Sequence, residues 1–196
     1  MSFLNLKSVL AALLMFSTFA SAQTYTLISQ NMPVTVSGEE SVYQQGAFAV
    51  DGDLSTRWSS PHYDYEWIQV DLGSDQDVDK IILNWESSFA TEYHIFVAKD
   101  GSTSWGDPTF IQYNGQGGTE EYTQSFGNGR YVAIQGFQRN WINGAQYGIS
   151  LYELEIYTQA GREVLWLGEK ADYPSEVAEG EAFFHTGLQQ SFVFNK

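Results

Sequence analysis

The ten residues "AVDGDLSTRW", Ala49 to Trp58, combine acidic side chains with residues typical of a protein core. Asp51 and Asp53 flank a glycine, and Thr56 follows three residues later. Asp-Gly is a common turn dipeptide, so one interpretation is a solvated turn that leads into a strand, with Trp58 in the core. The other is a loop for a hard cation, since calcium takes about six to eight oxygen ligands from side chains and carbonyls. The local pattern leaves both interpretations open.

The N-terminal segment has the layout of a secretory signal peptide. Lys7 is followed by the apolar run Val9 to Phe16 and then by the small residues "ASA", Ala20 to Ala22. This apolar run is too short for a membrane span and matches the central region of a cleaved signal. We therefore expect cleavage near Ala22, a mature chain that starts at Gln23, and a secreted protein, either extracellular or periplasmic.

The charge of the chain narrows the class of partner. Lys and Arg number 9 against 24 Asp and Glu, which gives a formal net charge of −15. This balance argues against nucleic acid and against anionic membrane lipid, because both require basic patches, and it suits a cationic ligand. With no cysteine, a secreted chain must be held by its core or by a metal. Aromatic residues make up 16%, which suits a sugar-binding surface but is also common in β-proteins.

Alternating hydrophobicity predicts an all-β domain. The segments "WIQVDL" (67–72), "YHIFVA" (93–98) and "LYELEIY" (151–157) alternate with the period of a strand. Between them lie the turn signals "DLGSDQD", "AKDGSTSWGD", "NGQGG", "GNGR" and "NGAQYG". Many short strands with glycine-rich turns indicate a sandwich or barrel, and residues 25–157 have the size of one such domain.

The composition changes after Tyr157. Residues 158–196 contain the apolar run Val164 to Leu167, then an acidic stretch, then several phenylalanines. This C-terminal tail is too short for a second domain. It is interpreted as an added hairpin, a linker or an interaction tail, and the last of these predicts a protein partner that binds the tail.

The order of the segments supplies a family resemblance. "LISQNMPVTVSGEE", "AVDGDLSTRWSS", "EWIQVDLG", "VDKIILNWESSFATEYHIFVAKDG", "GRYVAIQGFQRN" and "YGISLYELEIY" follow one another along the chain. This series resembles the discoidin, or factor V/VIII type C, superfamily, and within it the bacterial family 32 carbohydrate-binding modules. The resemblance spans residues 25–157. It implies a galactose-binding-like jelly-roll β-sandwich, a structural calcium ion, sugar binding by loops at one end, and no catalysis.

The resemblance also answers the question of the acidic loop, because the corresponding stretch wraps calcium in such modules. It implies side-chain or carbonyl ligands at Phe48, Asp51, Asp53, Thr56, Tyr152 and Glu153. Asp53 is expected to contribute its carbonyl, whereas Asp51 and Glu153 contribute carboxylates. Such a set of oxygens suits calcium and would tie the first loop to the last strand. The competing interpretation of Glu153 is a solvent-facing residue on an alternating strand.

The ligand site is expected in the end loops. One branch of these modules contains "LNWE" and "YG-x-SL", as this chain does, and includes members that bind chitosan or glucans. The candidate ligand residues are Glu40, His62, Glu86, Arg139, Trp141 and Tyr147. Carboxylates at two of these positions would pair with sugar amines. The predicted ligand is therefore a polysaccharide, either an aminosugar polymer or a β-glucan.

The chain departs from this branch in two loops. One loop has Pro61-His62 where an acid is expected, and another is longer and adds Trp141 as a platform for a sugar ring. Arg139 is open to a second interpretation, as a surface charge or an anchor of its own loop. Arg57 and Arg130 are interpreted as structural.

Two other classes of function are alternatives to sugar binding. An enzyme is disfavoured because the chain has no cysteine nucleophile, no G-x-S-x-G motif, and only three scattered histidines. An adhesion or protein-interaction module, docking onto a cell surface or a larger assembly, remains the alternative to sugar binding.

Overall fold

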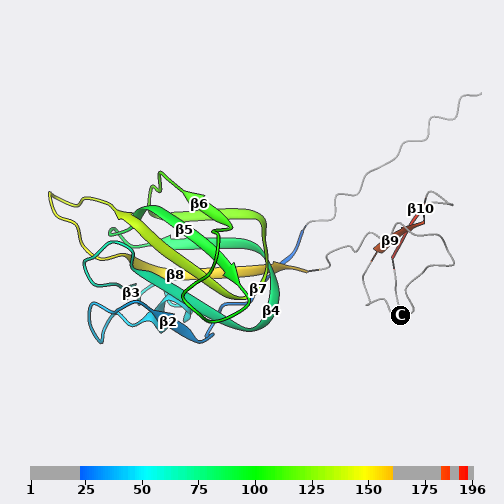
Figure 1. Ribbon diagram of the computed structural model, residues 1–196, viewed down its shortest axis with the longest axis horizontal. Helices are drawn as coiled ribbons and strands as arrows, with labels where there is room; N and C mark the ends of the chain where they lie inside the picture. Colours follow the sequence, from blue (N-terminus) through cyan, green and yellow to red (C-terminus); the bar gives the residue numbers. More distant parts are fainter. Residues whose placement is uncertain (1–22, 161–181, 186–189, 194–196) are drawn as a thin grey trace, which may run out of the picture.

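The structure is a computed structural model that describes residues 23–160, 182–185 and 190–193. The predicted signal peptide and the run Val164 to Leu167 lie outside these residues. The elements, shown in Figure 1, are β1 (Tyr25–Leu27), β2 (Val34–Val36), the 3-10 helix η1 (Gly46–Val50), β3 (Trp58–Ser59), β4 (Trp67–Trp85), β5 (Ala90–Ala98), β6 (Phe110–Gln112), β7 (Thr119–Arg139), β8 (Ser150–Gln159), β9 (Ala182–His185) and β10 (Gln190–Val193). Within the described ranges, no helix is long and apolar enough to cross a membrane.

Two long strands build both layers of a β-sandwich. The main sheet has the order β1-β8-β4-β7-β5-β6, with β2 added to β4 and β3 added to β8, and every pairing is antiparallel. The first part of β4, residues 67–71, pairs with residues 131–135 of β7. Its last part, residues 80–84, pairs with residues 119–123. β4 and β7 thus run together from one layer into the other, where β8 joins them (Figure 1).

Two of the predicted turns are wrong. "DLGSDQD" and "GNGR" lie inside β4 and β7, where the paired strands bend from one layer to the other. The register shifts here between Asp71 and Gln76 and again between Val78 and Lys80. Gly73 and Gly127 take φ of 82° and 105°, values that other residues rarely adopt, so the bend uses the same residues as a turn.

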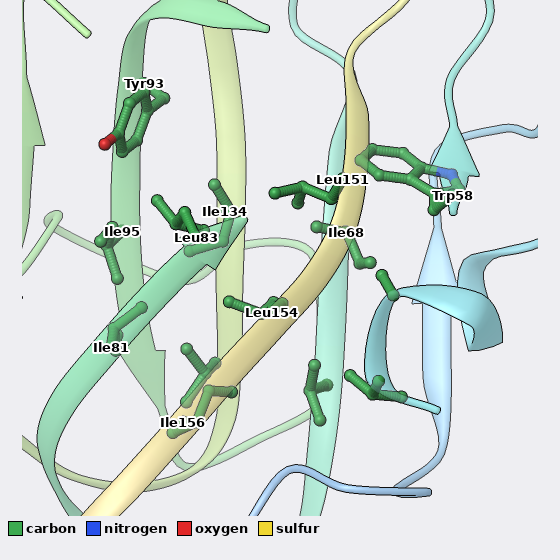
Figure 2. Close-up of a cluster of buried hydrophobic side chains, with 14 of the residues drawn as sticks. Trp58, Ile68, Ile81, Leu83, Tyr93, Ile95, Ile134, Leu151, Leu154 and Ile156 are labelled. Carbon is green, nitrogen blue, oxygen red and sulfur yellow. The ribbon is translucent and has the colours of Figure 1, made fainter. Parts of the chain in front are cut away.

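The core lies between the two layers and confirms the predicted alternation. Ile68 and Ile95 of one layer and Leu83 and Leu154 of the other are fully buried in one cluster (Figure 2). Trp58 is buried as expected. The fold is therefore the all-β sandwich that the strand pattern predicts.

The tail contributes a separate hairpin. β9 and β10 pair antiparallel with each other in a two-stranded sheet. β8 continues two residues past Tyr157, and Gln159 pairs with Tyr25 of β1. The protein partner expected for the tail stays a prediction.

Glu120 of β7 holds one edge of the core together. Its Oε2 accepts hydrogen bonds from the Trp85 indole at 2.9 Å and from the Tyr93 hydroxyl at 2.5 Å, and its Oε1 accepts one from the Gln116 amide at 2.7 Å. Trp85 and Tyr93 are 4% and 0% exposed, so their polar atoms have little access to water. Burial, followed by the hydrogen bond to Glu120, raises the pKa of Tyr93 above its ordinary value.

We expect Glu120→Ala to lower the free energy of unfolding by about 2–4 kcal/mol, because it leaves buried donors without a strong acceptor. Chemical denaturation measures this change. Glu121→Ala is the matched control: Glu121 is exposed and pairs with Lys80 at 2.6 Å, so its loss should cost about 1 kcal/mol or less. Equal destabilisation by the two variants would show that the hydrogen bonds accepted by Glu120 do not stabilise the core as proposed.

Candidate functional site

Four loops meet at one end of the sandwich through backbone hydrogen bonds. The Glu40 amide donates to the Ser59 carbonyl at 2.8 Å, which joins the loop after β2 to β3. The Glu86 amide donates to the Ser150 carbonyl at 3.1 Å, and the Asn140 amide to the Phe89 carbonyl at 3.0 Å. The Ser60 amide donates to the Ile149 carbonyl at 2.9 Å, which joins the loop after β3 to the loop after β7. Together these bonds hold the loops that follow β2, β3, β4 and β7 against one another.

A pocket of about 300 Å³ opens between these loops. It is lined by Glu40, Arg57, Ser59, Glu86, Ser87, Ser88, Ile142, Tyr147 and Ser150. Three of the six predicted ligand residues, Glu40, Glu86 and Tyr147, therefore line one cavity although they lie far apart in the sequence.

Glu86 is held in place by its neighbours. Ser87 Oγ donates to its Oε1 at 2.6 Å, and the Ser88 amide donates to its Oε2 at 2.9 Å. Burial alone would raise the pKa of Glu86, but these hydrogen bonds and the charge of Arg57 outweigh it, so the pKa lies below its ordinary value. Glu86 thus presents a fixed negative charge at neutral pH.

Arg57 is the cation that the sequence analysis missed. Its side chain lines the pocket, and its buried Nε has no hydrogen-bond partner among the described residues. Arg130, which was interpreted in the same way, does have a structural role: it forms two hydrogen bonds with Asp71, at 2.6 and 2.7 Å. The sequence around Arg57 gave no signal for the difference, because only the fold places Arg57 in one pocket with Glu40 and Glu86.

His62 stands at the edge of the pocket. Its Nε2 lies 3.2 Å from Glu40 Oε1, and its ring packs edge-on against Tyr147 with centroids 5.6 Å apart. Tyr147 remains 46% exposed, so part of its ring faces solvent beside the carboxylates. The structure thus brings His62 together with two of the residues that line the pocket.

Arg139 does not line the pocket. Its Nε donates to Asp64 at 2.7 Å, and its Nη1 donates to the Tyr147 carbonyl at 3.0 Å. Its side chain is 10% exposed. These contacts correspond to the second interpretation of Arg139, an anchor that fixes the loop carrying Tyr147.

Trp141 also lies outside the pocket lining. It precedes a tight turn in which Ile142 and Ala145 exchange backbone hydrogen bonds of 2.9 and 3.0 Å. Ile142 lines the pocket, whereas Trp141 is 68% exposed. The ring is therefore exposed next to a residue that lines the pocket, and its role as a platform stays a prediction.

The acidic loop closes on the last strand of the sandwich. Thr56 Oγ1 lies 2.8 Å from Asp51 Oδ2 and 2.9 Å from the Asp53 carbonyl, so three oxygens meet there. Glu153 Oε1 accepts from the amides of Gly52 and Asp53 at 2.8 and 3.1 Å. The acidic loop and Glu153 are thus joined, although about 100 residues separate them.

Glu153 is 5% exposed, so it is not the solvent-facing residue of the alternative interpretation. Burial, together with the nearby Asp51 carboxylate, raises the pKa of Glu153 to about 7. A buried carboxylate beside a second carboxylate is costly unless a proton or a cation compensates the charge. This chemistry suits a hard dication.

The remaining expected ligands are backbone oxygens. Phe48 lies in η1, directly before the acidic loop. Tyr152 lies at a bulge of β8, because Leu151 and Glu153 pair with consecutive residues of β4. No three His, Cys, Asp or Glu side chains of the described chain form a cluster that could hold a metal. A calcium shell here would consist of two carboxylates and neutral oxygens.

Comparisons with known proteins agree with the fold. The family model of the F5/8 type C domain matches residues 33–153. Chitosan-binding module 1 of a chitosanase/glucanase from Paenibacillus sp. IK-5 is 34% identical with a TM-score of 0.61, over 68% of this chain and 99% of that module. Module 2 of the same enzyme, solved in complex with chitotriose, is 30% identical with a TM-score of 0.61, over 67% and 99%.

Two further relatives are more distant in sequence or much longer. The family 32 module of NanJ from C. perfringens, in complex with galactose, is 21% identical with a TM-score of 0.55, over 69% of this chain and 100% of that module, and supports the fold alone. A polysaccharide lyase 8 family protein, HylA, from Enterococcus faecalis is 32% identical in a match of 152 aligned residues that covers 70% of this chain. The match spans 11% of the length of HylA.

We expect Arg139→Gln to loosen the loop of residues 140–148, because it removes the bonds to Asp64 and to the Tyr147 carbonyl. Amide hydrogen exchange in that loop should accelerate, while the free energy of unfolding falls by only about 1–2 kcal/mol. Lys99→Gln removes the same charge and breaks the exposed ion pair with Asp75, so it serves as the control. Unchanged exchange in the loop of the Arg139 variant would show that this anchor is unnecessary.

Proposed function

The chain belongs to the F5/8 type C domain family, and on that basis we propose that it is a non-catalytic carbohydrate-binding module whose end-loop pocket binds an aminosugar polymer of the chitosan type. The observation behind this proposal is the pair of carboxylates, Glu40 and Glu86, in one pocket beside the partly exposed ring of Tyr147. It is supported by two chitosan-binding modules that are at least 30% identical over about two thirds of the chain.

The groups of the pocket divide the tasks of sugar recognition. The ionised Glu86 accepts a charge-assisted hydrogen bond from a sugar ammonium, which is stronger than a neutral one. Arg57 lines the pocket, and its guanidinium would donate hydrogen bonds to sugar hydroxyls. Tyr147 covers part of the apolar face of a ring, and Trp141 does the same for a residue outside the cavity.

A β-glucan is the competing ligand. A neutral glucan offers hydroxyls and an apolar ring face but no charge, so it would bring no counter-charge to the two carboxylates. Fixed carboxylates favour the aminosugar polymer, because part of their desolvation cost is then offset by a paired charge.

The proposal includes a structural calcium ion at the acidic loop. Asp51 and Glu153 would hold it with their carboxylates, and Thr56 and the carbonyls of Phe48, Asp53 and Tyr152 would complete the shell. The ion would neutralise two adjacent carboxylates and fasten the acidic loop to β8. The ion would stabilise the fold and would not contact the sugar.

The location follows from the sequence alone. We infer from the pattern of residues 1–22 that the protein is exported, to the extracellular space or the periplasm, where polysaccharides are accessible. Cleavage near Ala22 leaves β1, which begins at Tyr25, close to the new N-terminus.

Glu86→Gln should weaken binding of chitosan oligosaccharides about tenfold, because it removes one charge-assisted hydrogen bond. Calorimetric titration at low and high salt measures this effect. Salt should weaken chitosan binding by the unsubstituted protein more than binding by the variant. Glu121→Gln removes the same charge at a residue that does not line the pocket, so it serves as the control. Fully N-acetylated oligosaccharides lack the ammonium and should bind both proteins equally. Unaltered chitosan binding by Glu86→Gln would reject the pairing.

Calcium should raise the free energy of unfolding by about 2–3 kcal/mol when it exceeds its Kd about a hundredfold, since it binds the folded state alone. Thermal melts after chelation, with added calcium or magnesium, measure the effect. Asp51→Asn should abolish the response to calcium. Asp53→Asn should retain it, because the Asp53 side chain binds Ser55 and its carbonyl is the expected ligand. A chelated protein that does not respond to calcium would disprove the site.

A further inference from the structure

The sandwich has a second hollow on the open face of the layer that contains β5. In this layer Trp67 of β4, Gln135 of β7 and His94 of β5 are paired in one row across the sheet. The next row contains Gln69, Ala133 and Phe96. Because Ile68, Val132 and Ile95 point into the core, these two rows face away from it.

The loop between β5 and β6 covers part of this face and places Trp105 over it. The rings of Trp105 and Phe96 lie 5.1 Å apart, and those of Trp105 and Trp67 lie 5.4 Å apart at an interplanar angle of 76°. A pocket of about 450 Å³ results, lined by Trp67, Phe96, Thr103, Ser104, Trp105, Gly106 and Gln135. It shares no lining residue with the end-loop pocket.

The indole of Trp105 is fixed from below. Its Nε1 donates to Gln69 Oε1 at 2.6 Å, and Gln69 is 5% exposed. A ring that is already oriented loses little conformational entropy when a ligand packs against it. Trp105 itself is only partly buried, so it lines the pocket and does not belong to the core.

The chemistry of the lining is neutral. None of the described residues that line this pocket is charged, although the chain as a whole has a net charge of −15. The lining combines aromatic rings with the hydroxyls of Thr103 and Ser104 and with the amide of Gln135. The Nε2 of Gln135 donates to the Tyr65 carbonyl at 3.2 Å, which orients its Oε1 as an acceptor.

We propose that this pocket is a second glycan-binding site, selective for an uncharged pyranose of a polysaccharide. One indole covers the apolar face of the sugar while the other contacts its edge, and Gln135, Thr103 and Ser104 bind its hydroxyls, as is usual in small-ligand sites. An ammonium or carboxylate sugar would find no counter-charge there. The two sites therefore differ in charge preference, and a mixed polymer would engage both with the gain of a bivalent contact.

The proposal does not depend on the function proposed for the end-loop pocket. Glu86 and Arg57 belong to that pocket alone, whereas Trp105 and Gln135 belong to the sheet-face pocket alone. Neutral binding at the sheet face would stand if the end loops bound no chitosan, and the reverse is equally true.

The test uses the full chain and two uncharged probes, cellohexaose and laminarihexaose. The indole N–H signals, assigned by single Trp→Phe substitutions, are followed by NMR during each titration. We expect the signal of Trp105 to shift with at least one probe, independently of salt. Trp105→Ala and Gln135→Ala should each weaken that binding about tenfold, whereas Glu86→Gln should leave it unchanged.

Thermal melts separate binding from folding. Gln135 is a partly exposed residue whose replacement keeps the backbone pairing of β7, so Gln135→Ala should melt near the unsubstituted protein. If neither probe shifts the Trp105 signal, or if both variants bind the probes with unchanged Kd, the proposal is overturned. It is also overturned if Trp105→Ala loses binding only in proportion to its unfolding while Gln135→Ala binds normally, because Trp105 is then only a cover for the sheet.

Discussion

The antiparallel pairing of β4 with β7 is the constraint on which the rest of this molecule depends. The two strands stay paired while they pass from one layer of the sandwich to the other. Every other strand of the main sheet is added to this pair directly or through one neighbour. The loops that follow β4 and β7 carry Glu86 and Tyr147, so the same pairing also determines where the end-loop pocket lies.

The strand pattern predicted the layers correctly because burial imposes a period of two. Ile68 and Val70 are buried between residues that face outward, as their spacing indicated. The same pattern could not reveal that β4 continues past Gly73. A glycine with positive φ is equally suited to a turn and to a bent strand, and only the partner strand decides between them.

The candidate site was partly predictable for a related reason. Glu86 and Tyr147 follow recognisable segments, and the fold does bring them into one pocket. Arg57 could not be told apart from Arg130 by its neighbours in the sequence, since each arginine precedes an aromatic residue. The difference is that Arg130 bonds to Asp71 of the neighbouring strand β4, whereas Arg57 lines a cavity. Long-range pairing produced both outcomes, and local sequence does not encode it.

The pairing of Tyr25 with Gln159 has a consequence for how the sandwich can be joined to other domains of one polypeptide. β8 begins at Ser150, which lines the end-loop pocket, and ends nine residues later, roughly 30 Å away for an extended strand. The backbone therefore enters the sandwich at β1 and leaves it at β8 side by side, at the end opposite the ligand loops. Such geometry allows the sandwich to be inserted as a domain into a longer polypeptide, because the two junctions are adjacent. Neither junction obstructs the end of the sandwich that contains the ligand loops.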